Sequence, residues 1–166
     1  MNYSLKNPRD LAAAVVVVSA GALAAAYISQ YVFGLDPCQL CFYQRKPYLM
    51  NILFGITALG LAPRSREAAV AVLFFCAGTF FIDSLIAGFH VGVEQHWWKG
   101  LESCSNYAMP EHASIEEMKK FIAGRNVVRC DVPAFVLFGI SMAGYNFILA
   151  TAMGFLTLVN AWRAKK

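Results

Sequence analysis

The chain has 166 residues, of which 58% are hydrophobic and only 14% are charged, and its mean hydropathy is +0.52. Soluble domains carry roughly 25% charged residues, so this composition excludes an ordinary soluble domain and indicates insertion into a membrane. The net charge of +4 is small. Because no run of lysines and arginines with interleaved aromatic residues is present, nucleic-acid binding is excluded as well.

Four apolar segments predict an all-α integral membrane protein, a four-helix transmembrane bundle formed by one domain over residues 1–166. A helix needs about 20 apolar residues to cross the hydrocarbon core, and we expect spans at about 11–32, 47–62, 68–89 and 135–160. The second span is short, about 24 Å at 1.5 Å per residue, so it should begin earlier, near Cys41. Pro133 is placed to begin the last helix.

The N-terminal segment also resembles a secretory signal peptide, because Lys6 and Arg9 precede its apolar stretch. A signal peptide's apolar region has about 7–15 residues, whereas this one is longer and ends in aromatic residues. We therefore expect an uncleaved span.

Basic residues near the span ends predict the orientation in the membrane. The two chain ends and the 63–67 turn carry a concentrated set: Lys6, Arg9, Arg64, Arg66, Arg163, Lys165 and Lys166. We expect both termini and this turn to be cytoplasmic, and the loops at about 33–46 and 90–132 to be periplasmic. Arg45 and Lys46 lie on the side that the rule disfavours.

The second outer loop contains a short amphipathic segment. Ser114 and Glu117 form a capping box, and Gly124 can end the helix. An isolated helix of this length is not stable in water, so we predict that it lies on the membrane surface. A solvated loop with accidental periodicity is the alternative.

The five cysteines fall into three groups. Cys38 and Cys41 form a Cys-x-x-Cys motif in the first outer loop, Cys104 and Cys130 lie in the second, and Cys76 lies inside the third span, where it should pack as an apolar residue. Cysteines in an oxidising compartment form disulfides, and a Cys-x-x-Cys pair is typically reactive rather than structural. Four cysteines can also bind zinc, but the wide spacing of the second pair favours redox chemistry and no metal.

The segment Cys38-Gln-Leu-Cys41-Phe-Tyr-Gln-Arg45 resembles the Cys-x-x-Cys-x-Tyr-x-Arg motif of the DsbB family. These bacterial inner-membrane quinone reductases reoxidise the periplasmic dithiol oxidase DsbA. The four expected spans, the two cysteine-bearing loops and the tight cytoplasmic turn agree with that family over nearly the whole chain. Members often have Glu where this chain has Gln44, which changes the local charge but removes no reacting group.

The resemblance implies a relay of electrons through the four loop cysteines in the bacterial cell inner membrane. A DsbA-like partner would attack Cys104, the freed Cys130 would exchange with Cys38, and the Cys41 thiolate would deliver electrons to ubiquinone or menaquinone. A DsbA-like partner is a strong oxidant, so glutathione and nicotinamide cofactors are too reducing to reoxidise it. A membrane quinone also explains why such an enzyme lies in lipid.

Three further residues are candidates for the site. Arg45 lies one helical turn after Cys41, and the motif implies that it contacts a quinone carbonyl, whereas an arginine without the motif would extend to the membrane interface. His90 would contact the other carbonyl or transfer a proton, or be structural. Asp83 lies at span depth, where a carboxylate suggests function; a proton path and a neutral structural role are equal alternatives.

Two other functions fit the same sequence. One is a DsbB-like paralogue that serves a dedicated partner rather than a general oxidase. The other is a non-catalytic tetraspan scaffold whose disulfides only staple its loops.

Overall fold

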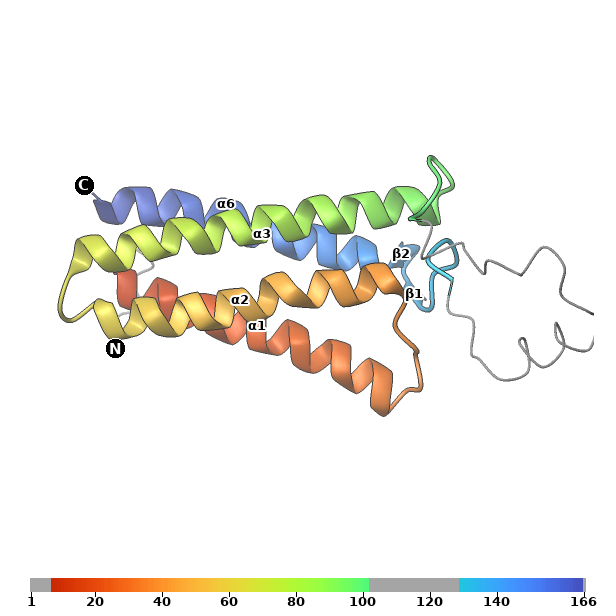
Figure 1. Cartoon of the computed structure of the whole chain (residues 1–166), viewed down its shortest axis with the longest axis horizontal. Coiled ribbons are helices and arrows are strands. Elements are labelled where there is room, and N and C mark those ends of the chain that lie inside the picture. The colour runs from red at the N-terminus through yellow and green to blue at the C-terminus, as the bar shows by residue number, and fades with distance from the viewer. Residues whose placement is uncertain (1–6, 102–128, 166) are drawn as a thin grey trace, which may run out of the picture.

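The structure is a computed structural model that describes residues 7–101 and 129–165. Four long helices run side by side in these ranges: α1 (Pro8–Tyr31), α2 (Gln39–Leu61), α3 (Arg66–Glu94) and α6 (Met142–Lys165) (Figure 1). The start of α1, the α2–α3 turn and the end of α6 lie at one end of the bundle. The α1–α2 loop and the end of α3 lie at the other.

Three of these helices, α1, α3 and α6, are long and apolar enough to cross a membrane. The prediction of an all-helical protein with helices able to cross a membrane is therefore confirmed for these three helices. Helix α2 is interrupted by polar side chains, among them Gln44, Arg45, Lys46 and Asn51, and it does not join the three. The predicted surface helix at 114–124 and Cys104 lie outside the described residues.

Side chains at the helix starts explain where the chain enters each helix. Asn7 accepts a hydrogen bond from the Arg9 backbone at 3.1 Å, and Pro8 occupies the first turn of α1, where its missing N–H is not needed. Ser65 accepts from the Ala68 backbone at 3.2 Å and so caps α3. The Ser65 cap thus ends the short α2–α3 turn.

The last helix begins at Met142, so the expectation of a start near residue 135 after Pro133 is wrong. Two short strands, β1 (Val136–Leu137) and β2 (Ile140–Ser141), pair antiparallel instead. Between them Phe138 and Gly139 both have positive φ, 49° and 77°, which is the turn geometry of a two-residue hairpin. Ser141 then accepts from the Gly144 backbone at 3.1 Å and caps α6.

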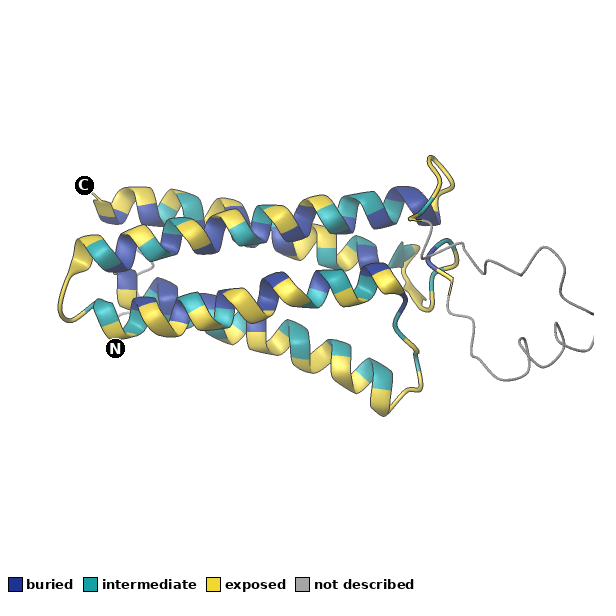
Figure 2. Cartoon of the chain, in the orientation of Figure 1, coloured by how far each residue is buried: buried dark blue, intermediate teal, exposed yellow. Residues whose placement is uncertain are grey.

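Apolar side chains occupy both the interior and the outside of the bundle. Leu11, Leu73 and Phe80 are fully buried between the helices. Many large apolar residues are instead exposed, among them Leu85 at 75% and Val17 at 69%. Figure 2 shows exposed positions along all four long helices. A soluble protein rarely exposes apolar surface on this scale, whereas a lipid-facing helix requires it.

Helices α1 and α2 approach closely at Gly55. A Cβ atom at this position would lie 2.6 Å from Val16 Cγ2 and 3.4 Å from the Ala12 carbonyl oxygen. Val16 is β-branched and its side chain is therefore stiff. Small residues that let helix backbones approach are the usual basis of packing in membranes.

We expect Gly55→Leu to destabilise the bundle by about 1–3 kcal/mol, the usual effect of overpacking. The measurement is thermal unfolding in detergent. Gly60→Leu is the matched control, because nothing lies within 4 Å of a Cβ there. Equal unfolding temperatures for the two variants would contradict the assigned contact.

Candidate functional site

Cys38 and Cys41 lie together at the N-terminus of α2. Cys38 is the N-cap residue, and its sulfur accepts a hydrogen bond from the Cys41 backbone at 3.3 Å. The two sulfurs are 2.9 Å apart and unbridged. Cys38 is buried and Cys41 is half-buried. Because a helix N-terminus favours negative charge, the pair is placed where a thiolate is stabilised.

The two thiols differ in acidity. A hydrogen bond from the Cys38 thiol lowers the pKa of Cys41, and the positive charge of Arg45 contributes in the same direction. The same hydrogen bond, together with burial, raises the pKa of Cys38. Of the two thiols, Cys41 is therefore the one that loses its proton first.

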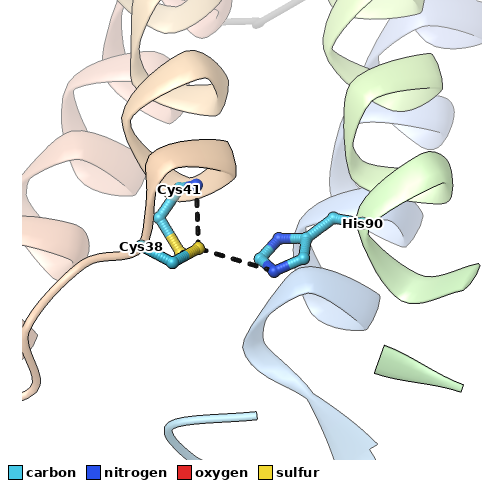
Figure 3. A group of neighbouring side chains, drawn as sticks. All are labelled: Cys38, Cys41 and His90. Atoms are coloured by element: carbon cyan, nitrogen blue, oxygen red, sulfur yellow. Dashed lines mark hydrogen bonds between the residues drawn. The ribbon is translucent and has the colours of Figure 1, made fainter. Parts of the chain in front are cut away.

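His90 comes from α3 and faces the cysteine pair (Figure 3). Its Nε2 atom is 3.6 Å from Cys38 Sγ and 3.8 Å from Glu94 Oε1. Its Nδ1 atom is 2.8 Å from Gln44 Nε2, and the ring is 4% exposed. Helices α2 and α3 thus bring His90 to the Cys38–Cys41 motif, from which the sequence analysis selected it separately.

A polar network behind His90 was missed by the sequence analysis. Asn146 on α6 donates through Nδ2 to Gln44 Oε1 at 2.8 Å and to Asp83 Oδ2 at 3.1 Å. Its Oδ1 atom accepts from the Tyr48 hydroxyl at 2.5 Å. Asp83 is fully buried, and it joins this network through its Oδ2 atom. The signal that could have found Asn146 is a polar amide inside an apolar span.

Arg45 turns toward α1. Its Nη1 donates to Gln30 Oε1 at 2.7 Å, and its Nη2 lies 3.5 Å from the Ala26 carbonyl oxygen. The guanidinium carbon is 4.9 Å from the Tyr27 ring centroid and 5.2 Å from that of Phe42, within the range of cation–π attraction. These contacts hold the Arg45 side chain against α1.

A cavity of about 670 Å³ adjoins these residues. Helix α1 diverges from α2 toward this end of the bundle (Figure 1), and α6 contributes a further wall. The apolar lining includes Ala22, Leu23, Phe33, Leu35 and Leu149, and the polar lining includes Cys41, Gln44, Arg45, His90 and Asn146. An apolar cavity with a few convergent polar groups is the usual form of a small-molecule site.

Cys130 lies beside the first pair. It is 1% exposed and belongs to one buried cluster with Cys38, Leu40 and Val93, and it is disulfide-bonded. The flanking Arg129 and Asp131 form an exposed ion pair, with Arg129 Nε 2.9 Å from Asp131 Oδ1. Cys76 packs elsewhere, in the apolar core with Leu73 and Phe80, as expected.

The sulfurs of Cys38 and Cys41 and a ring nitrogen of His90 lie within 4.8 Å of one another, a grouping that can hold a metal ion. Zinc accepts these ligand types. The Gln44 amide nitrogen lies 2.8 Å from Nδ1 of the same ring. If Nδ1 accepts from this amide, the ring proton stays on Nε2, the nitrogen that faces Cys38, and opposes metal binding there. The absence of a metal stays a prediction.

Comparison with known proteins agrees with the motif. The family model "Disulfide bond formation protein DsbB" matches residues 8–160. An uncharacterized protein of Rickettsia prowazekii is 31% identical over 151 residues, covering 90% of this chain and 86% of the relative. The disulfide bond formation protein B of Albidiferax ferrireducens is 28% identical over 164 residues, covering 95% and 89%.

The protein of the same name from Xylella fastidiosa (strain Temecula1) is 29% identical over 153 residues, covering 88% of this chain and 85% of the relative. No solved structure matches the chain. Family membership implies an oxidoreductase of disulfide bond formation, and together with the three apolar helices it points to the inner membrane. The chain belongs to the DsbB family.

Proposed function

We propose that this protein is a membrane thiol:quinone oxidoreductase that reoxidises a periplasmic DsbA-like dithiol oxidase. The observation that carries the proposal is the position of the Cys38–Cys41 pair. Its sulfurs lie at a helix N-terminus, and both residues line an apolar cavity together with Arg45 and His90. A reactive dithiol that opens on an apolar cavity suits a lipid-soluble electron acceptor.

We also propose that α2 forms a fourth span, at about 47–62. It lies beside the spans at about 11–32 and 68–89 and the span that α6 forms from Met142 onward. Both termini are cytoplasmic, and the loops at about 33–46 and 90–132 are periplasmic. Support comes from the bundle, because the start of α1, the α2–α3 turn and the end of α6 share one end (Figure 1), and those segments carry the clustered basic residues.

The relay begins at the second cysteine pair. A thiolate of the partner attacks Cys104 of the Cys104–Cys130 disulfide, which forms a mixed disulfide and releases Cys130 as a thiolate. Cys130 attacks Cys38 of the Cys38–Cys41 disulfide, and Cys41 leaves as a thiolate. The burial of Cys130 and Cys38 in one cluster supports this exchange.

The partner's second thiolate then resolves the mixed disulfide, leaves as part of an oxidised partner and frees Cys104. Cys104 attacks Cys130, re-forms the second-loop disulfide and releases Cys38. The two electrons and two protons taken from the partner now reside on the Cys38–Cys41 dithiol. Its lowered pKa makes Cys41 the member of the dithiol that loses its proton first.

The residues around the cavity fit a quinone. Arg45 supplies guanidinium N–H donors, His90 lines the same cavity beside the cysteine pair, and the apolar walls from α1 and α6 suit a ring with a hydrocarbon tail. A bound ubiquinone or menaquinone would accept the two electrons and two protons of the dithiol. Arg45, held by Gln30 and stacked on Tyr27, places a positive charge beside the Cys41 thiolate without needing to reorganise.

Replacing single cysteines tests the relay. With a reduced DsbA-like protein and a soluble ubiquinone analogue, we expect Cys41→Ser to lose quinol formation almost completely, because the remaining Cys38 has no partner at the cavity with which to form a disulfide. Cys76→Ser is the control and should retain turnover. A parent protein that folds but produces no quinol would instead support the scaffold alternative.

Arg45 is tested separately from the thiol exchange. Arg45→Ala should raise the apparent KM for the quinone by about tenfold or more, the loss expected for one hydrogen bond to a charged group. Arg45→Lys keeps the charge but not the planar donor group. Its apparent KM for the quinone should therefore lie between those of the parent protein and Arg45→Ala. An unchanged apparent KM in Arg45→Ala would remove Arg45 from the quinone site.

A further inference from the structure

The donor and acceptor of each hydrogen bond behind His90 can be assigned by starting from Asn146. This side chain faces Asp83 Oδ2 and Gln44 Oε1 with the same nitrogen, Nδ2. A carboxylate oxygen only accepts, and an amide nitrogen supplies two donors. The Tyr48 hydroxyl donates to the remaining oxygen, Oδ1. The contact with the Asp83 carboxylate sets this orientation of the Asn146 amide, and the contacts with Tyr48 and Gln44, which could also be made with the amide reversed, are compatible with it.

The orientation of Asn146 determines that of Gln44. Because Gln44 Oε1 accepts from Asn146, the amide nitrogen of Gln44 is the atom that faces His90 Nδ1, at 2.8 Å. An amide nitrogen has no lone pair to accept a proton, so Nδ1 must be the acceptor. The neutral ring then carries its proton on Nε2.

The Nε2 atom faces the Cys38 sulfur, and the His90 ring also hydrogen-bonds to the backbone of Cys130. Nε2 lies 3.6 Å from Cys38 Sγ, and Cys38 Sγ lies 2.9 Å from Cys41 Sγ. Gln44 and His90 are 7% and 4% exposed, so water competes little for these hydrogen bonds. Donors that follow one another in a buried chain polarise and strengthen each other.

We propose that Gln44 and Asn146 are positioning residues that hold His90 as the Nε2-protonated tautomer, with its N–H directed at Cys38, so that a continuous donor chain ends on the Cys41 sulfur. This inference rests on the proposed function for its purpose. The same N–H stabilises Cys38 when Cys104 displaces it from Cys130 in the relay, because Cys38 leaves there as a thiolate.

The variant Gln44→Glu tests the chain with almost no change in shape. A carboxylate cannot donate to Nδ1, so the ring proton should move to Nδ1 and donate to Glu instead. The ring-nitrogen chemical shifts of protein labelled at histidine report the tautomer directly. The chain has three histidines, and the signal lost in a His90→Gln variant identifies His90. A parent ring protonated on Nδ1 would overturn the proposal.

The second readout is alkylation of Cys41 by iodoacetamide in the reduced protein, located by mass spectrometry. Asn146→Leu adds no charge and breaks the series of hydrogen bonds at Asn146, one residue further from His90 than Gln44. It should slow alkylation by roughly threefold to tenfold, the effect of one net hydrogen bond. Gln44→Glu should slow it as well. Slowing in Gln44→Glu alone would show that the added charge acts, and would overturn the proposal.

Asn160→Leu is the matched control on the same helix. Asn160 is half-buried and donates only within α6, to the Leu156 carbonyl at 2.8 Å, so the variant should keep the parent's alkylation rate. Neither readout requires a quinone or a partner protein. Failure of the donor chain is therefore distinguishable from failure of the proposed function, which the parent's quinone turnover reports.

Discussion

The contact between the Cys38 and Cys41 sulfurs depends on the first turn of α2. Cys38 stands outside the helix as its cap and Cys41 stands inside it, so the turn that begins the helix also brings the sulfurs to 2.9 Å. The same turn directs backbone N–H groups at the pair, which favours a thiolate. Arg45 follows Cys41 by four residues, about one helical turn, and therefore lies on the same side of α2, facing the cavity. Local geometry thus produces a charged sulfur beside a cation.

The helix bundle supplies what the local geometry lacks. Helix α3 places His90 and Glu94 against the pair, and α6 places Asn146 behind His90. Helix α1 packs on α2 at Gly55 and then diverges toward the site end (Figure 1), which leaves the cavity between them. An apolar exterior and a polar, buried network at one end are compatible because Tyr48, Asn146, Gln44 and His90 are linked to one another by hydrogen bonds within the protein.

Much of this was predictable from local patterns. Apolar runs predicted helices that α1, α3 and α6 confirm as capable of spanning a membrane, and the Cys-x-x-Cys-x-Tyr-x-Arg spacing predicted the family. The proximity of His90 to Cys38 and the Gln44–Asn146 hydrogen bond were not predictable, because they join residues 52 and 102 positions apart. The late start of α6 was missed because Phe138–Gly139 adopts positive φ, and an apolar run does not distinguish a hairpin from a helix.

In the proposed relay, the Cys38–Cys41 dithiol alone delivers two electrons to a quinone. The most direct measurement is a single turnover of a Cys104→Ala/Cys130→Ala variant, reduced and freed of reductant, mixed with a ubiquinone analogue. We expect one equivalent of quinol and a new Cys38–Cys41 disulfide in each molecule, with no partner protein present. A folded variant that keeps both thiols and forms no quinol would contradict the account.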